Sequence, residues 1–253
     1  MGDPASPPSV AGKVMAILAA FLPGDVRLTL TEICRRAGLP LSTGHRLVGE
    51  LVGGGFLERL PDGSYRVGMR LWRIGAQATE PRELRELALP YMEDLYAATR
   101  ENVQLAVLSD DQALYVERLR GPRSVPIVTR VAAELPLHAT GVGKVLLAFG
   151  PPELTDRVIA AGLHRHTPHT ITDPVRLRAE LARIRDSGVA GTDEEMSLGS
   201  RSVAVPVRSR GRVVAALSLV TRRHAGDMRL LAPALLTAAR ALSRDLDAEA
   251  GFR

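Results

Sequence analysis

The apolar positions in the first third of the chain follow helical spacing in three short segments. They recur every three or four positions over residues 10–21, which predicts a first helix. The sequence Thr-Leu-Thr-Glu at 29–32 is a capping box and predicts that a second helix begins there. Gly38 tolerates the positive φ of a tight turn, and the apolar spacing of residues 41–51 predicts a third helix. Two helices joined by such a turn indicate a helix-turn-helix.

A short hairpin is expected directly after the third helix. Residues 55–59 and 64–67 are rich in residues typical of strands, and Pro61-Asp62-Gly63 between them is a turn sequence. A hairpin in this position is the wing of a winged helix-turn-helix. Residues 1–8, rich in proline, serine and glycine, are expected to form a disordered tail. The first domain is therefore expected to span residues 9–75.

The rest of the chain alternates between strand and helix patterns. A helical stretch with Pro90 inside it comes first, and residues 76–92 are the expected linker helix. Residues 93–250 then form a second domain, a sheet with helices packed on it. Its strands are expected at 102–108, 113–119, 125–131, 202–207 and 213–220, and its helices at 140–149, 152–161, 173–187 and 228–246.

Composition is consistent with two domains but says little about function. The 253 residues exceed the roughly 100–200 of one domain. The net charge is +5, and 31 of the 33 basic residues are arginines. Such a bias also follows from a GC-rich coding sequence, so overall basicity is weak evidence for nucleic-acid binding.

Cysteine content and hydropathy indicate a cytoplasmic protein that does not enter a membrane. Cys34 is the single cysteine, which excludes an intramolecular disulfide and a thiolate metal cluster and fits a reducing compartment. No apolar run approaches the roughly 20 residues of a membrane span, and the N-terminus lacks a basic region followed by an apolar stretch.

The outer face of the third helix carries the chemistry of a DNA-recognition helix. Short hydroxyls and an arginine near its N-terminus suit phosphate and base-edge contacts in the major groove. Residues 1–75 hold nine basic and six acidic residues, so this segment carries the net positive charge that binding to DNA phosphates requires. The alternative is a solvated face of an ordinary helical bundle. The predicted DNA contacts are Thr31, Ser42, Thr43, His45 and Arg46 in the helix-turn-helix and Arg59, Tyr65 and Arg66 in the wing.

Gly44 is unusual in the middle of the predicted recognition helix. Glycine at such a position costs about 1 kcal/mol relative to alanine, and an apolar residue would pack better there. Close approach of the two helices is one explanation. Cys34, on the inner face of the preceding helix, is interpreted as a small core residue rather than a reactive thiol.

Three stretches, in the same order, resemble the IclR family of bacterial transcription regulators. They are Leu-Ser-Thr-Gly-His-Arg-Leu at 41–47, Leu-Pro-Leu-His-Ala-Thr-Gly-Val-Gly-Lys at 135–144 and Asp-Glu-Glu-Met-Ser-Leu-Gly-Ser-Arg-Ser-Val-Ala-Val-Pro-Val at 193–207. The resemblance covers residues 10–247. It implies a two-domain α+β chain, in which a mainly α winged helix-turn-helix is joined by a linker helix to a GAF-like α/β effector-binding domain. It also implies a homodimer or homotetramer that reads palindromic double-stranded operator DNA.

The same resemblance implies a small-molecule effector, an organic acid or an aromatic metabolite. Val220 stands where some members have a second serine, and Ser202 where others carry cysteine, so the ligand's identity is left open. Independently, Thr140-Gly-Val-Gly at a helix start presents free N–H groups for a carboxylate, unless Thr140 serves only as a cap. The implied contacts are the backbone N–H groups of Gly141 and Val142, the side chains of Asp193, Ser202 and Ser218, and an apolar wall of Ile127 and Leu135.

A metal-dependent sensor or an enzyme is the main alternative. Its candidate ligands are His164, His166 and His169 together with Asp193, Glu194 and Glu195. The spacing of these three histidines is typical of a loop. It does not place two of them four residues apart on a helix, as a pair of metal ligands often is. A nucleotide-binding Walker loop is excluded because no glycine stands at 138. We therefore expect no catalysis, no metal and no cofactor. The expected function is that of a DNA-binding regulator, a repressor, and the expected effector changes its affinity for the operator.

Overall fold

The computed structural model describes residues 9–22, 25–77, 79–121, 130–223 and 230–251. The chain divides into two compact units, residues 1–80 and 81–253, and each is treated by itself. The predicted disordered tail and the predicted contact Ile127 lie outside the described residues, as does most of the strand predicted at 125–131. Within the described part, no helix is both long and apolar enough to cross a membrane.

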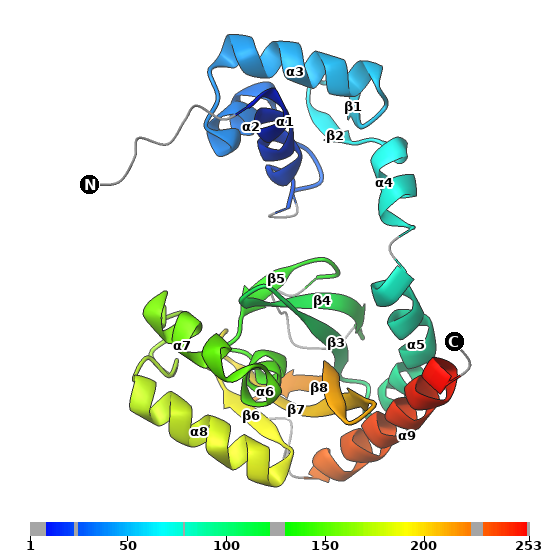
Figure 1. The fold of residues 1–253 in the computed structure, drawn as a ribbon, viewed down its shortest axis with the longest axis vertical. Helices are drawn as coiled ribbons and strands as arrows, with labels where there is room; N and C mark the ends of the chain where they lie inside the picture. Colours follow the sequence, from blue (N-terminus) through cyan, green and yellow to red (C-terminus); the bar gives the residue numbers. More distant parts are fainter. Residues whose placement is uncertain (1–8, 23–24, 78, 122–129, 224–229, 252–253) are drawn as a thin grey trace. The chain divides into compact units, whose positions relative to one another are not determined.

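The N-terminal unit is a winged helix-turn-helix, as the sequence predicts (Figure 1). The Thr29 hydroxyl accepts from the Glu32 amide at 3.3 Å, and the Glu32 carboxylate accepts from the Thr29 amide at 2.8 Å, so the capping box is confirmed. Gly38 ends the second helix at φ +64°. The elements are α1 (Val10–Ala19), α2 (Leu30–Ala37), α3 (Leu41–Gly53), β1 (Leu57–Arg59), β2 (Tyr65–Val67) and α4 (Met69–Gly75).

Close packing of α2 against α3 accounts for Gly44. A Cβ atom at Gly44 would lie 2.1 Å from the sulfur of Cys34, a distance that real Cβ contacts do not reach. Cys34 is buried on α2, next in the sequence to the core residue Ile33. Glycine therefore stands at position 44 because the cysteine occupies the space of its missing side chain.

The C-terminal unit is built on a six-stranded antiparallel sheet in the order β5-β4-β3-β8-β7-β6. Four of these strands match the sequence predictions. The short β5 and β6 were not predicted, because three or four residues leave too little alternation to read. The strands are β3 (Asn102–Ser109), β4 (Gln112–Leu119), β5 (Glu134–Pro136), β6 (Ala190–Asp193), β7 (Ser200–Ser209) and β8 (Arg212–Arg222).

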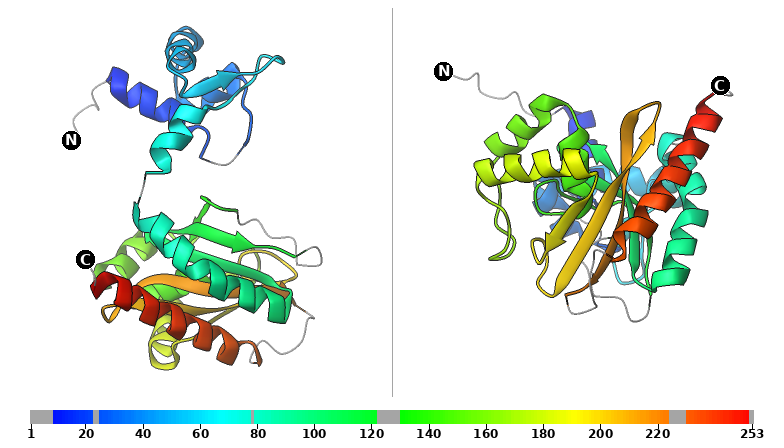
Figure 2. Two further views of the ribbon diagram at one scale, coloured as in Figure 1. Left: turned by 90° about the vertical axis from the view of Figure 1, so that its right-hand side faces the viewer. Right: turned by 90° about the horizontal axis from the view of Figure 1, so that it is seen from below.

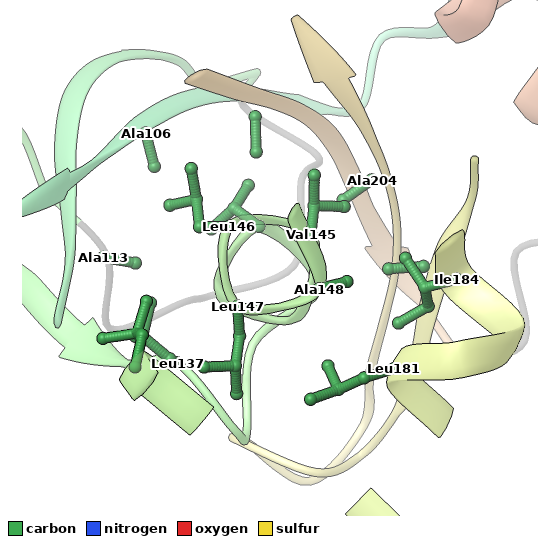
Figure 3. Packing of buried hydrophobic residues seen from close by; sticks show 14 of the residues in the cluster. Ala106, Ala113, Leu137, Val145, Leu146, Leu147, Ala148, Leu181, Ile184 and Ala204 are labelled. Carbon is green, nitrogen blue, oxygen red and sulfur yellow. The ribbon is translucent and has the colours of Figure 1, made fainter. Parts of the chain in front are cut away.

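Helices cover both faces of this sheet (Figures 1 and 2). On one face Val145 and Leu146 of α6 pack toward the small sheet residues Ala106 and Ala204, while Leu147 faces Leu181 of α8 (Figure 3). The small side chains let α6 lie close to the strands. The helices on this face are α6 (Gly141–Phe149), α7 (Pro152–Ala160) and α8 (Pro174–Ser187); those on the other are α5 (Thr79–Thr99) and α9 (Ala232–Gly251).

Most of α5 belongs to the core of the C-terminal unit. Its residues Leu84, Ala88, Met92 and Leu95 are buried with the sheet and α9, because their spacing of three or four places them on one side of the helix. Pro90 lies inside the helix and is exposed. The helix therefore begins at Thr79, inside the linker predicted at 76–92, and continues beyond it to Thr99.

A β-bulge in β4 directs the side chains of Tyr115 and Glu117, which would share a face in a regular strand, to opposite faces of the sheet. The pairing of β3 with β4 shifts between Leu105 and Ala106, which leaves Val116 as the extra residue. Tyr115 consequently packs in the core beneath α6, and the buried Glu117 forms an ion pair with Arg85 of α5. One short stretch of β4 thus contacts the helices of both layers.

Candidate functional site

The outer face of α3 carries exposed polar side chains, as predicted for a recognition helix. Ser42, His45 and Arg46 are exposed and Thr43 is half-buried, while Leu47, Val48 and Leu51 point into the core. Thr31 is exposed near the start of α2. The helical repeat explains this arrangement, because it places the polar positions of α3 on one side of the helix and the apolar positions on the other.

Arginines on this surface are partly occupied by neighbouring carboxylates. Arg46 pairs with Glu50 one helical turn later at 2.5 Å, and Arg66 pairs across the wing with Glu58 at 2.8 Å. All four side chains are about half exposed, and such pairs contribute only about 0.2–1 kcal/mol. A phosphate can therefore displace the carboxylate at small cost. Arg59 is exposed and has no ion pair within the described part of the chain.

Tyr65 does not present its side chain to the surface, which corrects its place among the predicted wing contacts. The residue is 7% exposed and belongs to the core of the N-terminal unit. Its backbone pairs with Leu28, which donates to the Tyr65 carbonyl at 3.0 Å and accepts from the Tyr65 amide at 2.8 Å. This extra bridge turns the tyrosine inward.

A pocket lies where the N-terminus of α6 meets the sheet. Five of the seven predicted effector contacts line it: Leu135, Gly141, Val142, Ser202 and Ser218. Asp193 is not among the lining residues, and Ile127 lies outside the described residues. The remaining lining residues are Gln104, Tyr115, Ala139, Thr140, Thr192, Met196, Ser197, Ser200 and Val220.

The first turn of α6 presents backbone donors at this pocket. The Thr140 hydroxyl accepts from the Gly143 amide at 3.1 Å, so threonine caps the helix as expected. The cap leaves the amides of Gly141 and Val142 without intrahelical partners, as for any first turn. Close packing defines this corner, since a Cβ at Gly141 would lie 2.5 Å from the Ser202 hydroxyl oxygen. Capping and anion binding are thus compatible roles for this turn.

The described residues that line the pocket combine apolar side chains with several uncharged polar ones, and none of these residues is charged. Ser218 donates to the buried amide oxygen of Gln104 at 3.4 Å, and the hydroxyls of Thr192 and Ser202 lie 2.6 Å apart. Tyr115, whose pKa is raised by burial, forms part of the apolar wall. Sequence reasoning missed Gln104, although a polar residue at an inward position of a predicted strand was an available signal.

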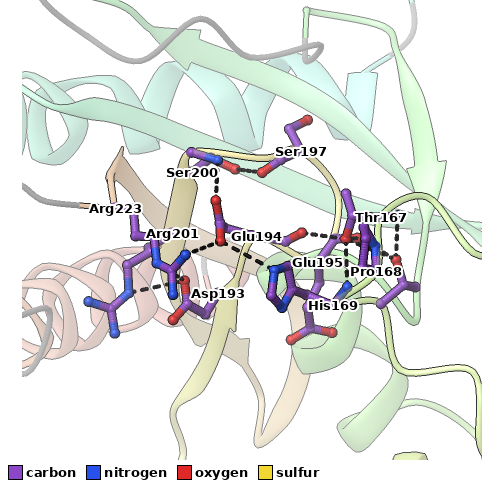
Figure 4. A network of polar contacts seen from close by, with 12 residues as sticks. Thr167, Pro168, His169, Asp193, Glu194, Glu195, Ser197, Ser200, Arg201 and Arg223 are labelled. Atoms are coloured by element: carbon purple, nitrogen blue, oxygen red, sulfur yellow. Dashed lines mark hydrogen bonds and ion pairs between the residues drawn. The ribbon is translucent and has the colours of Figure 1, made fainter.

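Asp193 and Glu194 are held by arginines and lie at the end of β6 (Figure 4). Asp193 lies 3.5 Å from Arg201 and 3.7 Å from Arg223, and the buried Glu194 accepts from Arg223 at 2.5 Å. His169 lies 3.5 Å from the same Glu194 carboxylate. The positive charge that balances these carboxylates is supplied by the protein itself.

The other two histidines of the metal alternative lie around His138 rather than around the carboxylates. The ring of His166 is 5.1 Å from that of His164 and 5.9 Å from that of His138. Burial lowers the pKa of His138, whose Nε2 lies 2.9 Å from the His164 carbonyl oxygen. Among the residues the structure describes, no three histidine, cysteine or acidic side chains are placed to hold a metal ion. The described residues therefore give the metal-dependent alternative no geometric support.

Each of the two units matches a protein-family model. The IclR helix-turn-helix domain model matches residues 10–61, and the bacterial transcriptional regulator IclR C-terminal model matches residues 76–247. Together these matches cover most of the chain.

Individual relatives and a solved structure are similar to this chain over most of its length. The chain is 34% identical to the HTH-type transcriptional regulator XynR of Escherichia coli K12, over 83% of this chain and 84% of that protein. It is also 34% identical to the DNA-binding transcriptional repressor YiaJ of the same organism, over 86% and 80% of the two chains. The crystal structure of an IclR homolog from Microbacterium hydrocarbonoxydans, complexed with 4-hydroxybenzoate, shares 39% identity at a TM-score of 0.89, covering 95% of this chain and all of that one. The two Escherichia coli relatives are named as transcriptional regulators, not as enzymes.

Proposed function

The chain belongs to the IclR family of bacterial transcriptional regulators, and we propose that it represses its target genes through the exposed face of α3 and responds to an aromatic monocarboxylate bound at the N-terminus of α6. The family assignment makes it a DNA-binding regulator modulated by an effector. The observation that carries the proposal is the pocket, whose described lining combines the first-turn residues Gly141 and Val142 of α6 with uncharged polar side chains. An operator-binding regulator acts beside the chromosome, so we also propose a cytoplasmic location.

The DNA contacts proposed are the exposed polar residues of α3, supported by the wing. Ser42, His45 and Arg46 would face the major groove, with Thr31 and Thr43 beside them. Arg59 and Arg66 of the wing would reach the phosphate backbone or the minor groove. Arg46 is the strongest candidate for a base contact, because arginine recognises guanine through two hydrogen bonds.

Arg46→Ala is expected to weaken operator binding about 10- to 100-fold, since one good arginine contact contributes about 1–3 kcal/mol. Folding should hardly change, because the side chain is exposed. The measurement is fluorescence anisotropy with DNA from the promoter region of the protein's own gene, at two salt concentrations and with and without 4-hydroxybenzoate.

The matched control for this variant is Arg176→Ala, which removes one exposed arginine from α8 of the other unit. It should leave operator affinity unchanged. Equal affinity of Arg46→Ala and the unaltered protein would remove Arg46 from the contacts. A complex that no aromatic acid shifts would exclude the proposed effector class.

The effector class follows from the charge balance of the pocket. A carboxylate can accept hydrogen bonds from the Gly141 and Val142 amides at the positive end of the α6 dipole. A ring would then pack against Tyr115 and Leu135, and a hydroxyl on that ring would meet the Gln104 and Ser218 side chains. Because no basic side chain lines the pocket among the described residues, we expect a second anionic group to remain uncompensated. The 4-hydroxybenzoate bound by the Microbacterium homolog has this chemistry.

A homodimer is proposed because α4 exposes an apolar surface. Met69, Trp72 and Ile74 are large apolar residues that are more than half exposed, and α4 buries none of its own residues. Large apolar side chains exposed together on one short helix indicate an association site. Two recognition helices in a dimer can then address the two halves of a palindromic operator.

Trp72→Ser is expected to weaken dimerisation at least about tenfold, because buried tryptophans are common interface hot spots. Sedimentation equilibrium measures the change as a shift from the mass of two chains toward that of one. The neighbouring Arg73→Ser, also exposed, is the control and should leave the mass unchanged. A monomeric unaltered protein would refute the dimer.

A further inference from the structure

A buried ion pair lies beside the pocket but does not line it. Lys144 of α6 is 0% exposed and donates from Nζ to the Glu195 carboxylate at 2.5 Å. Burial raises the pKa of Glu195, and the Lys144 ammonium opposes that rise. The second Glu195 oxygen is buried and makes no hydrogen bond within the described part of the chain. Buried ion pairs seldom stabilise a fold more than apolar residues of similar volume would. Stability therefore does not explain this pair.

The two partners come from two different segments, each of which also contributes to the wall of the pocket. Lys144 follows Gly141 and Val142, the pocket residues of the first turn of α6, by less than one helical turn. Glu195 directly precedes Met196 and Ser197, which line the pocket from the loop at residues 194–199 between β6 and β7. The ion pair thus joins two parts of the pocket wall, the first turn of α6 and the 194–199 loop.

Other contacts fix the internal conformation of the 194–199 loop (Figure 4). The Glu194 carboxylate accepts from the Gly199 amide at 2.6 Å, and the Glu194 amide donates to the Ser200 carbonyl at 2.8 Å. The hydroxyls of Thr167 and Thr170 donate to the carbonyls of Glu194 and Glu195 at 2.6 and 2.7 Å. These bonds hold the loop to itself and to residues 167–170, whereas Lys144 ties it to α6.

We propose that Lys144 and Glu195 are positioning residues for effector binding, whose ion pair holds the 194–199 loop against the N-terminal turn of α6. Without the pair, the loop keeps its internal hydrogen bonds but its Met196 and Ser197 side chains lose their fixed distance from the Gly141 and Val142 amides. A ligand that contacts both parts of the wall then pays for ordering them, which lowers its affinity. This inference rests on the proposed effector function of the pocket.

The variant that tests it is Lys144→Met with Glu195→Leu, which removes both charges and leaves neither buried alone. We expect a melting temperature at or above that of the unaltered protein. Amide exchange over residues 196–200 should rise about tenfold or more, because local opening sets exchange there. The dissociation constant of 4-hydroxybenzoate should rise about 10- to 100-fold. Glu195→Gln retains an oxygen for Lys144 and should restore part of the protection.

The control removes an exposed ion pair of the same unit, Arg178 with Asp156, by Arg178→Met with Asp156→Leu. It should change neither exchange over 196–200 nor ligand affinity. Unaltered exchange and affinity in the Lys144 and Glu195 double variant would overturn the proposal. If the unaltered protein fails to bind 4-hydroxybenzoate, the proposed ligand class is wrong, and exchange alone decides: a rise supports the positioning role and no rise refutes it. If the double variant does not fold, Glu195→Gln decides: because it keeps the hydrogen bond but loses the charge attraction, a smaller rise in exchange over 196–200 supports the proposal, and no rise refutes it.

Discussion

Gly44→Ala is expected to destabilise the N-terminal unit and to weaken operator binding. The new methyl group would meet the sulfur of Cys34 at 2.1 Å, inside a core that holds both helices. Overpacking of this kind costs about 1–3 kcal/mol, which for a unit of this size lowers the melting temperature by about 4–8 °C per kcal/mol. Calorimetry of the full chain measures the stability change. Because α3 must also move away from α2, operator affinity should fall about tenfold or more.

Two further variants separate packing from helix propensity. Gly49→Ala lies on the same helix, exposed, with nothing within 4 Å of its added Cβ. It should raise stability by about 0.5–1 kcal/mol, since alanine is the better helix former. Gly44→Ala combined with Cys34→Ala replaces the lost sulfur by the new methyl group and should regain most of the stability. If this pair is no better than Gly44→Ala alone, steric conflict with Cys34 is not the cause.

Gly141→Val is expected to abolish the effector response while leaving operator binding intact. Its Cβ would lie 2.5 Å from the Ser202 hydroxyl oxygen and 3.3 Å from the Ala204 Cβ, so the first turn of α6 has to move off the sheet. The amides at 141 and 142 would then lose their place at the pocket. Two hydrogen bonds to a charged group contribute about 1.5–3 kcal/mol each, so the dissociation constant of 4-hydroxybenzoate should rise at least about 100-fold.

The measurement is the shift in operator affinity caused by 4-hydroxybenzoate, followed by anisotropy in each variant. Gly191→Ala is the control, because its Cβ on β6 would have no neighbour closer than 3.9 Å. It should respond as the unaltered protein does. A Gly141→Val variant that still responds would place the effector elsewhere; one that also loses operator binding would show that the substitution damages more than the pocket.

The sequence by itself determined the elements whose signals are local. The capping box at Thr29 and Glu32 satisfies backbone groups within one turn, so it identifies the start of α2 wherever the helix packs. Gly38 marks the turn for a similar reason, since few other residues adopt its left-handed conformation. The hairpin of β7 and β8 was likewise readable from alternation and a short turn.

Tertiary contacts decided which way particular side chains face. Tyr65 was predicted on the wing surface, yet pairing with Leu28 turns it into the core. Glu117 points to α5 because of the bulge at Val116, and no local pattern announces an extra residue in a strand. Gly44 looked unfavourable until the position of Cys34 was known. In each case a residue distant in sequence supplies the reason.

The pocket is the clearest product of the tertiary structure. The strand order β5-β4-β3-β8-β7-β6 brings Gln104 of β3 beside Ser218 of β8 and Ser202 of β7 beside Thr192 of β6. The sequence pointed to the helix start at Thr140, because a helix N-terminus presents free donors by its own geometry. The partners that complete the pocket are chosen by sheet order and register, which depend on hydrogen bonds between strands up to about a hundred residues apart and leave no trace in local periodicity.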